Sequence, residues 1–194
     1  MESVIRNLLV AGLLLFPLIS YQSVASDLSY SYIEVAYIES DIDVDGIDVD
    51  GDGFGFLVSN DIADNLAIFF GYEDEEFDFD IDGEALSFGF DYHTPISETG
   101  DVVISFALVD VEISQPTFGS EDDTGNVIQV GFRNQINETA EVGAFISRID
   151  VFDDTETSYG FNLALGATDG VQFTFGYGKG DDTDTISIGI RANY

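Results

Sequence analysis

From residue 28 to the end of the chain, apolar and polar residues alternate in segment after segment, and no stretch shows sustained helical spacing. Alternation with a period of two is typical of β-strands with two unlike faces. We therefore expect an all-β, up-and-down antiparallel fold with ten strands, and eight strands as the alternative. The predicted strands are at 28–40, 53–59, 65–74, 84–93, 101–112, 125–134, 139–149, 157–167, 171–179 and 185–194.

The two faces of these predicted strands differ in side-chain size. One face carries large apolar residues such as Phe70, Phe88 and Phe173, whereas the other is mostly glycine, alanine and serine. A surface in water is normally about 25–35% charged, and small residues suit the crowded interior of a narrow barrel. The bulky face must then point outward into lipid, where a closed barrel satisfies every backbone hydrogen bond. The sequence predicts a transmembrane β-barrel.

The tyrosines indicate how the strands run. With both termini in the periplasm, the odd-numbered strands run outward, and the tyrosines then fall into two groups at the membrane interfaces. Tyrosine belongs there because its ring is apolar and its hydroxyl binds water. The expected extracellular group is Tyr37, Tyr72, Tyr159 and Tyr177, and the expected periplasmic group is Tyr92 and Tyr194.

The first 26 residues read as a secretory signal peptide. Arg6 lies in a short polar start, an apolar stretch follows over 8–19, and Ala25 and Ser26 supply small residues for cleavage. The apolar stretch is too short to span a bilayer as a helix, although a retained anchor or a buried helix is the alternative. We expect a cleaved signal peptide at 1–26 and an outer-membrane barrel at 27–194.

Composition adds a strong negative charge. The 194 residues include 5 Lys and Arg against 38 Asp and Glu, for a net charge of −33, yet 45% of residues are hydrophobic. This charge excludes nucleic acid as a partner, because phosphate binding needs clustered Lys and Arg, and the absence of cysteine excludes disulfides. About two-thirds of the acidic residues fall in the predicted extracellular loops at 41–52, 74–84, 110–123, 150–156 and 181–184.

Four charged residues lie on the small face of the strands, and they are candidates for pairing across the lumen. Glu34 and Asp91 are expected to face Arg133 and Arg191, because an unpaired buried charge is costly. The alternative is a polar path for small solutes. A barrel of ten strands has room for packed side chains and a thin file of water, but no open channel.

Several acidic runs resemble the start of a calcium-binding loop. Oxygen donors at alternate positions followed by glycine occur in D41-I-D43-V-D45-G46 and in D78-F-D80-I-D82-G83. Calcium takes six to eight oxygen ligands, so the candidate ligands are Asp41, Asp43, Asp45, Asp52, Asp78, Asp80 and Asp82. An EF-hand, however, needs a flanking helix on each side, and here the flanks are strands. The alternative is strands that project above the membrane with one acidic face in water.

Catalysis is not expected. The chain has one histidine, His93, and it falls at the periplasmic end of the fourth predicted strand, beside Pro95. A general base is therefore missing from the extracellular rim, where substrate would arrive.

The chain resembles the small OmpA/OmpX-like outer-membrane β-barrel proteins, and among them a family labelled as a sulfation-dependent quorum factor. The likeness lies in the segments L28-S-Y-S-Y-I-E-V-A-Y37, V44-D-G-I-D-V-D-G-D-G53 and G89-F-D-Y-H93. The resemblance implies residence in the cell envelope without a cofactor or established catalytic residues. The closing R191-A-N-Y194 is similar to the C-terminal signature read by the barrel-assembly machinery, which expects a terminal aromatic residue.

From these features we expect a monomer in the cell outer membrane that has a structural or surface-interaction role. Its expected partners are outer-membrane lipid, lipopolysaccharide and, through Tyr194, the barrel-assembly machinery. The first alternative is a narrow porin-like channel for small, preferably cationic solutes. The second is calcium-bridged adhesion or contact with lipopolysaccharide through the acidic loops.

Overall fold

The computed structural model describes residues 28–44, 46–117, 119–152, 154–168 and 170–194, so the predicted signal peptide at 1–26 lies outside the described residues. None of the described segments forms a helix that is long and apolar enough to cross a membrane. Ten strands account for the fold: β1 (Tyr32–Val44), β2 (Ile47–Ala63), β3 (Leu66–Phe77), β4 (Ile81–Pro95), β5 (Gly100–Gln115), β6 (Gly119–Asn137), β7 (Ala140–Val151), β8 (Asp154–Thr168), β9 (Val171–Lys179) and β10 (Thr183–Asn193).

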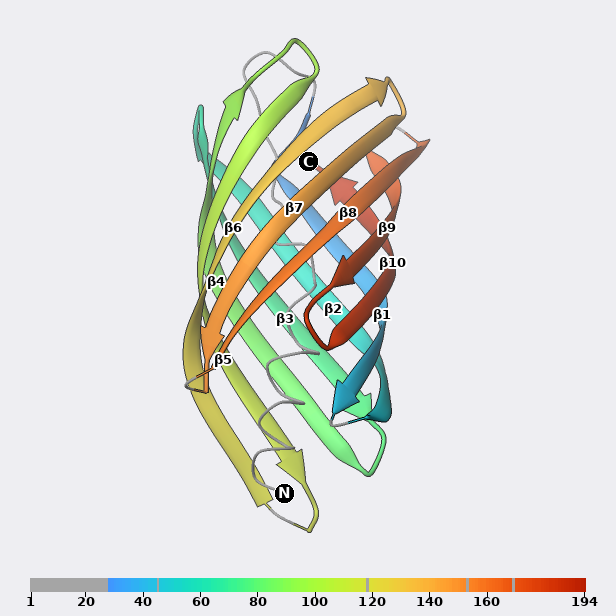
Figure 1. Cartoon of the computed structure of the whole chain (residues 1–194). Coiled ribbons are helices and arrows are strands. Elements are labelled where there is room, and N and C mark those ends of the chain that lie inside the picture. The colour runs from blue at the N-terminus through green and yellow to red at the C-terminus, as the bar shows by residue number, and fades with distance from the viewer. Residues whose placement is uncertain (1–27, 45, 118, 153, 169) are drawn as a thin grey trace.

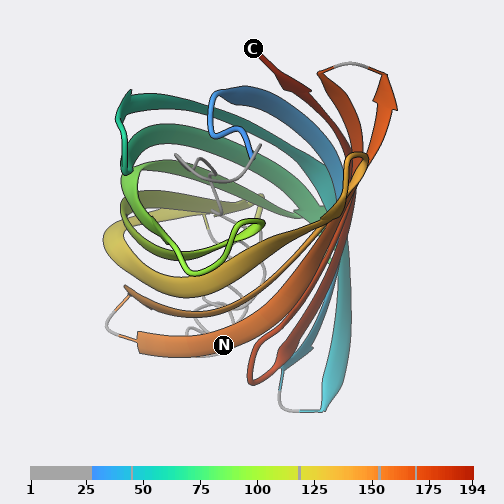
Figure 2. The ribbon, with the colours of Figure 1, turned by 90° about the horizontal axis from the view of Figure 1, so that it is seen from above.

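The strands form a closed antiparallel barrel (Figures 1 and 2). Each strand pairs with the next one in sequence, and β1 closes the ring by pairing with β10 from Tyr32 opposite Asn193 to Ile42 opposite Thr183. Closure leaves no strand edge unpaired, which is the requirement for a sheet in lipid. The predicted up-and-down topology with ten strands is confirmed, and the alternative of eight strands is wrong.

The two faces of the wall are arranged as predicted. Large apolar side chains point outward and are exposed, among them Phe54 at 62%, Phe88 at 59% and Ile188 at 61%. Their sequence neighbours, such as Gly55 and Gly89, point inward and are buried. We call the outward apolar zone the apolar belt. It consists of Ile33, Val35, Tyr37, Phe54, Phe56, Ile68, Phe70, Tyr72, Leu86, Phe88, Phe90, Tyr92, Ile104, Leu108, Ile128, Val130, Phe132, Ile146, Tyr159, Phe161, Leu165, Phe173, Tyr177, Ile186, Ile188 and Ile190.

Several segments that we predicted as loops are strand, so the predicted strand boundaries are wrong there. β2 begins at Ile47 and β6 at Gly119, and the described residues of the acidic run 41–52 belong mostly to β1 and β2, which pair as far as Val44 opposite Ile47. The reason is that the alternation continues through this run, since Ile42 and Val49 remain buried inside. In Figure 1 these hairpins extend the lower end of the barrel, and β9 and β10 end short of the others.

The interior also contains larger side chains than the small-residue pattern indicated. A buried apolar cluster occupies much of the lumen, and it includes Ile38, Leu57, Phe69, Phe77, Val109, Phe145 and Ile149. A ten-stranded ring encloses more space than glycine, alanine and serine can fill, so these side chains supply the missing volume.

Candidate functional site: an acidic outer wall and a filled interior

The apolar belt ends abruptly at one end of the barrel. The next outward positions are charged on most strands: Glu39, Asp52, Asp74, Glu84, Asp110, Arg148, Lys179 and Asp184. Three tyrosines mark this boundary, and each donates its hydroxyl proton to a boundary carboxylate: Tyr37 to Asp52 at 3.2 Å, Tyr72 to Asp74 at 3.2 Å and Tyr177 to Asp184 at 2.7 Å. The ring of each tyrosine therefore lies in the belt while its hydroxyl binds the first charge beyond it.

Beyond this boundary, carboxylates continue along the outer face to the end of the barrel. We call this surface the acidic wall. It consists of Glu39, Asp41, Asp43, Asp48, Asp50, Asp52, Asp74, Glu76, Asp82, Glu84, Asp110, Glu112, Asp122 and Asp184. It spans β10 and β1 to β6. These carboxylates lie on the strands themselves, whereas the sequence analysis placed most of them in loops.

Strand register aligns the wall carboxylates in rows across neighbouring strands. One row joins Asp184, Asp41 and Asp50, and a second joins Glu39, Asp52, Glu76 and Asp82. A third row joins Asp74, Glu84, Glu112 and Asp122. Like charges directly opposite each other on a sheet are destabilising.

The repulsion within the first row contributes to the raised pKa of one of its members. The pKa of Asp41 is raised, first by desolvation and then by the negative charges of Asp50, Asp48 and Asp184. Lys179 partly relieves the row, since its Nζ lies 2.7 Å from Asp184 Oδ2.

A groove of about 720 Å³ follows this part of the wall. Its lining includes Glu39, Asp41, Asp50, Asp52, Glu76 and Asp184, together with the tyrosines Tyr37 and Tyr177. With Asp78, which also lines it, the groove combines seven carboxylates with two phenol groups at the edge of the apolar belt.

The described candidate calcium residues lie on the β1–β2 hairpin, in the turn between β3 and β4, and on β4. Asp41, Asp43 and Asp52 lie along the β1–β2 hairpin, and Asp45 lies outside the described residues. Asp78 and Asp80 lie in the tight turn between β3 and β4, where Phe79 and Asp80 have positive φ, and Asp82 is on β4. Within the described ranges, no three His, Cys, Asp or Glu side chains are grouped closely enough to hold a metal ion by themselves.

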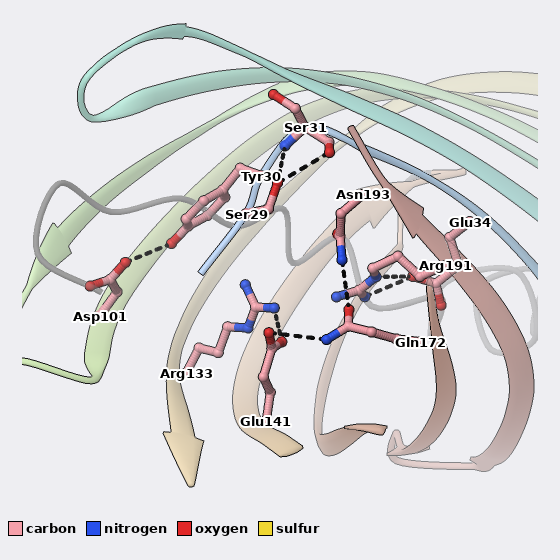
Figure 3. Close-up of polar contacts among 10 residues, drawn as sticks. All are labelled: Ser29, Tyr30, Ser31, Glu34, Asp101, Arg133, Glu141, Gln172, Arg191 and Asn193. Carbon is pink, nitrogen blue, oxygen red and sulfur yellow. Dashed lines mark hydrogen bonds and ion pairs between the residues drawn. The ribbon is translucent and has the colours of Figure 1, made fainter. Parts of the chain in front are cut away.

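At the opposite end, the interior holds two buried ion pairs (Figure 3). Arg191 Nη2 lies 2.7 Å from Glu34 Oε2, Arg191 Nε donates to the same oxygen at 2.7 Å, and Thr174 Oγ1 donates to Glu34 Oε1 at 2.7 Å. The guanidinium of Arg191 also lies 4.4 Å from the centre of the Tyr32 ring. Glu34 and Arg191 thus face each other inside the barrel, as residues paired in the β1–β10 register.

The second ion pair joins Arg133 to Glu141, which the sequence analysis did not identify. Gln172 Nε2 donates to Glu141 at 3.1 Å, and Asn193 Nδ2 donates to Gln172 at 3.2 Å. Glu141 is the second residue of β7, just after the turn from β6. The only signal in the sequence is that it alternates with outward residues, which places its side chain in the lumen.

The first described residues of the chain complete this polar layer. Tyr30 is fully buried, its hydroxyl donates to Asp101 at 3.2 Å, and its ring stacks on His93 with centroids 4.1 Å apart. Asp91 is also buried and faces the interior from β4. His93 is therefore packed inside the barrel, where a substrate at the acidic end cannot reach it.

Side chains fill the interior between these groups. The cavity bounded by Glu34, Arg133, Glu141 and Arg191 has a volume of about 10 Å³, which is room for about one water molecule. The polar layer at one end and the apolar cluster beside it leave little space for a solute.

Comparison with known proteins identifies the fold. A scan against protein-family models and a search of curated proteins each found no match. Among solved structures, the β domain of the Bordetella autotransporter BrkA is similar at 10% identity and a TM-score of 0.53, over 84% of this chain and 98% of that one. The translocator domain of the autotransporter NalP from Neisseria meningitidis is similar at 10% identity and a TM-score of 0.51, over 84% and 87%.

Neisserial surface protein A is also similar, at 11% identity and a TM-score of 0.49, over 84% of this chain and 96% of that one. The closed ring and its outward apolar belt define the class of protein, which is a transmembrane β-barrel of the outer-membrane type. The particular likenesses to BrkA and NalP show the same barrel fold and nothing finer.

Proposed function

We propose that this chain is a structural and surface-interaction protein of the outer membrane, and that its acidic wall binds lipopolysaccharide through bridging divalent cations. The acidic end would face the cell exterior, with both termini in the periplasm. The observation that carries the proposal is the set of carboxylate rows next to the apolar belt at one end of the barrel. In a membrane, this position corresponds to the anionic headgroups of the surrounding lipid.

Electrostatics supplies the reason. Rows of facing carboxylates repel one another, and hard divalent cations bind both carboxylate and phosphate oxygens. A cation shared between the wall and a lipid phosphate would relieve the repulsion and complete its coordination with ligands from both sides. A preformed site with three protein carboxylates is not required for such a bridge.

The test is binding of lipopolysaccharide to the refolded, immobilised barrel, measured by surface plasmon resonance in millimolar calcium and in EDTA. We expect binding in calcium and its loss in EDTA. The variant Asp41→Asn/Asp50→Asn/Asp52→Asn should weaken calcium-dependent binding by on the order of tenfold, or about 1.4 kcal/mol.

A matched control removes the same charge from the other end of the barrel. The variant Asp64→Asn/Glu98→Gln/Glu138→Gln carries three neutralised acids at turns away from the wall, and it should bind like the unaltered protein. Equal weakening by both variants would show that only net charge matters and would contradict a role for the wall. Binding that persists in EDTA would contradict cation bridging.

The alternative of a narrow channel gains no support from the filled interior, and planar-bilayer recordings without discrete openings would exclude it. The chain is proposed not to be an enzyme, because its sole histidine is stacked inside the barrel. Membership of the OmpA/OmpX-like group and recognition of Tyr194 by the barrel-assembly machinery both stay predictions. Tyr194 itself donates its hydroxyl proton to the carbonyl of Ser59 at 3.1 Å.

A further inference from the structure

Glu75 is a buried acid that the acidic wall does not include. It lies on β3 between the outward residues Asp74 and Glu76, points into the barrel and is 0% exposed. Its Oε2 accepts a hydrogen bond of 2.8 Å from Ser40 Oγ, whereas its Oε1 has no hydrogen-bond partner in the described part of the chain. A buried carboxylate oxygen without a donor is costly.

Two glycines on β2 create the space that Glu75 occupies. Gly53 is the register partner of Glu75, and Gly51 is the register partner of Ser40. A Cβ atom at Gly53 would come within 2.7 Å of the Glu75 Cγ atom. The missing side chains let Glu75 reach across β2 to the hydroxyl on β1.

β10 carries two inward-facing threonines, one of which lies beside Ser40. Ser40 Oγ lies 3.3 Å from Thr185 Oγ1, and these two residues are register partners on β1 and β10. Thr183 faces inward two residues before Thr185, and its buried Oγ1 also has no hydrogen-bond partner within the described segments. The group offers carboxylate and hydroxyl oxygens, which are hard ligands.

The ion pairs of the described residues leave Glu75 without a basic partner. They use Arg133, Lys179 and Arg191, which bind Glu141, Asp184 and Glu34. Protonation would remove the charge of Glu75, but the protonated oxygen would then need an acceptor. A bound cation would neutralise the charge and also occupy the empty side of Oε1.

We propose that Glu75, together with the hydroxyls of Ser40 and Thr185, binds a single small hard cation such as Na⁺ inside the acidic end of the barrel. The site lies at the same end of the barrel as the groove of about 720 Å³, whose lining includes Ser40. This site is independent of the acidic wall, since Glu75 faces the interior and the wall faces outward.

A proton competes with the cation for the same carboxylate. Burial raises the pKa of Glu75 from 4.5 to about 7, the hydrogen bond from Ser40 opposes this rise, and the negative charge of Asp52 adds to it. The carboxylate of Glu73, two residues earlier on β3, also repels that of Glu75. Cation binding is therefore expected to be strong above pH 8 and weak near pH 5.

The experiment compares thermal unfolding of the full-length barrel in detergent micelles at pH 8.5, in NaCl and in tetramethylammonium chloride at equal ionic strength. Both salts screen the acidic wall equally, but only Na⁺ is small enough for the interior site. We expect the melting temperature to be about 2–4 °C higher in NaCl when Na⁺ is at about five times its dissociation constant, and the difference to vanish at pH 5.

Two variants and one control identify the site. Glu75→Gln should abolish the difference between the salts, and Ser40→Ala, a small change that preserves packing, should reduce it by at least half. Glu76→Gln removes the same charge one residue away on the outer face, and should keep the full difference. Equal melting temperatures of the unaltered protein in the two salts would overturn the proposal, as would a loss of the difference in Glu76→Gln.

Discussion

The buried pair of Glu34 and Arg191 gives the sharpest test of how charge is held inside this barrel. Both side chains are about 5% exposed, and two hydrogen bonds and one ion-pair contact, each of 2.7 Å, join Glu34 to Arg191 and Thr174. We consider the single variants Arg191→Met and Glu34→Gln and their combination. Removing one partner of a buried ion pair typically costs about 3–5 kcal/mol, because the other charge is left uncompensated.

The structure predicts that the two single variants differ in severity. In Arg191→Met, Glu34 keeps only the donor of Thr174, so the full loss of about 3–5 kcal/mol is expected. In Glu34→Gln, Arg191 keeps its contact with the Tyr32 ring at 4.4 Å, and a cation–π contact in a desolvated site is worth about 1–2 kcal/mol. The loss in Glu34→Gln should be smaller by about that amount.

The double variant separates the ion pair from the two side chains that form it. With both charges removed, no uncompensated charge remains, and neutral replacements of buried ion pairs are often tolerated. We therefore expect the double variant to be more stable than Arg191→Met alone. The coupling free energy would be about 2–3 kcal/mol, as is typical of contacting residues in a double-mutant cycle.

Urea unfolding in detergent or lipid vesicles, followed by circular dichroism, measures each free energy of unfolding from its midpoint and slope. Thr174→Val serves as a control, since it removes one neutral donor and should cost only about 1–2 kcal/mol. Losses that simply add in the double variant would refute the reasoning, because they would mean that the two charges do not stabilise each other.

Three further predictions concern the acidic end. Asp41→Asn should stabilise the barrel by about 0.2–1 kcal/mol at low salt by relieving repulsion with Asp50, and urea midpoints should show this gain shrinking at 1 M NaCl. Gly53→Ala should cost about 1–3 kcal/mol, since its Cβ would overlap a backbone carbonyl, whereas Gly166→Ala, with its nearest atom at 3.4 Å, should be tolerated in the same assay. Burial raises the pKa of Glu156 from 4.5 to about 8, so the folded protein holds this proton more tightly than the unfolded chain does. Stability should therefore fall as the pH rises from about 5 to 8, by up to about 1.4 kcal/mol per pH unit. Melts of Glu156→Gln at different pH values should lack this component.

The sequence predicted the fold well because the strand period is local. Which face of a strand points inward depends only on the parity of its residues, so Phe88 and Gly89 could be assigned to opposite faces without any knowledge of the partner strands. The same parity placed Glu34 and Arg191 inside. The ends of the strands were harder to predict. At 41–52 the outward positions hold Asp instead of apolar residues, whereas the inward positions Ile42 and Val49 remain apolar and buried.

The pairing of lumen charges could not be read from the chain in the same way. Arg133 has Gly143 opposite it in the β6–β7 register, yet it binds Glu141, two residues earlier on β7. Such diagonal contacts depend on the tilt and stagger of strands around the closed ring, which are properties of the whole barrel. For the same reason, the stacking of Tyr30 on His93 could not be predicted from the chain alone.

The charges at the two ends of the barrel are balanced in different ways. At one end, Arg133 and Arg191 each bind a carboxylate inside the barrel, so the protein itself supplies the counter-charge. At the other end, the carboxylate rows have Lys179 as an ion-pair partner within the described residues, and that lysine binds Asp184. The 14 carboxylates of the acidic wall therefore face the surroundings, where cations from outside the protein must provide the counter-charge. This imbalance supports the proposed surface interaction, because the wall reaches electrostatic balance only together with ions from outside the protein.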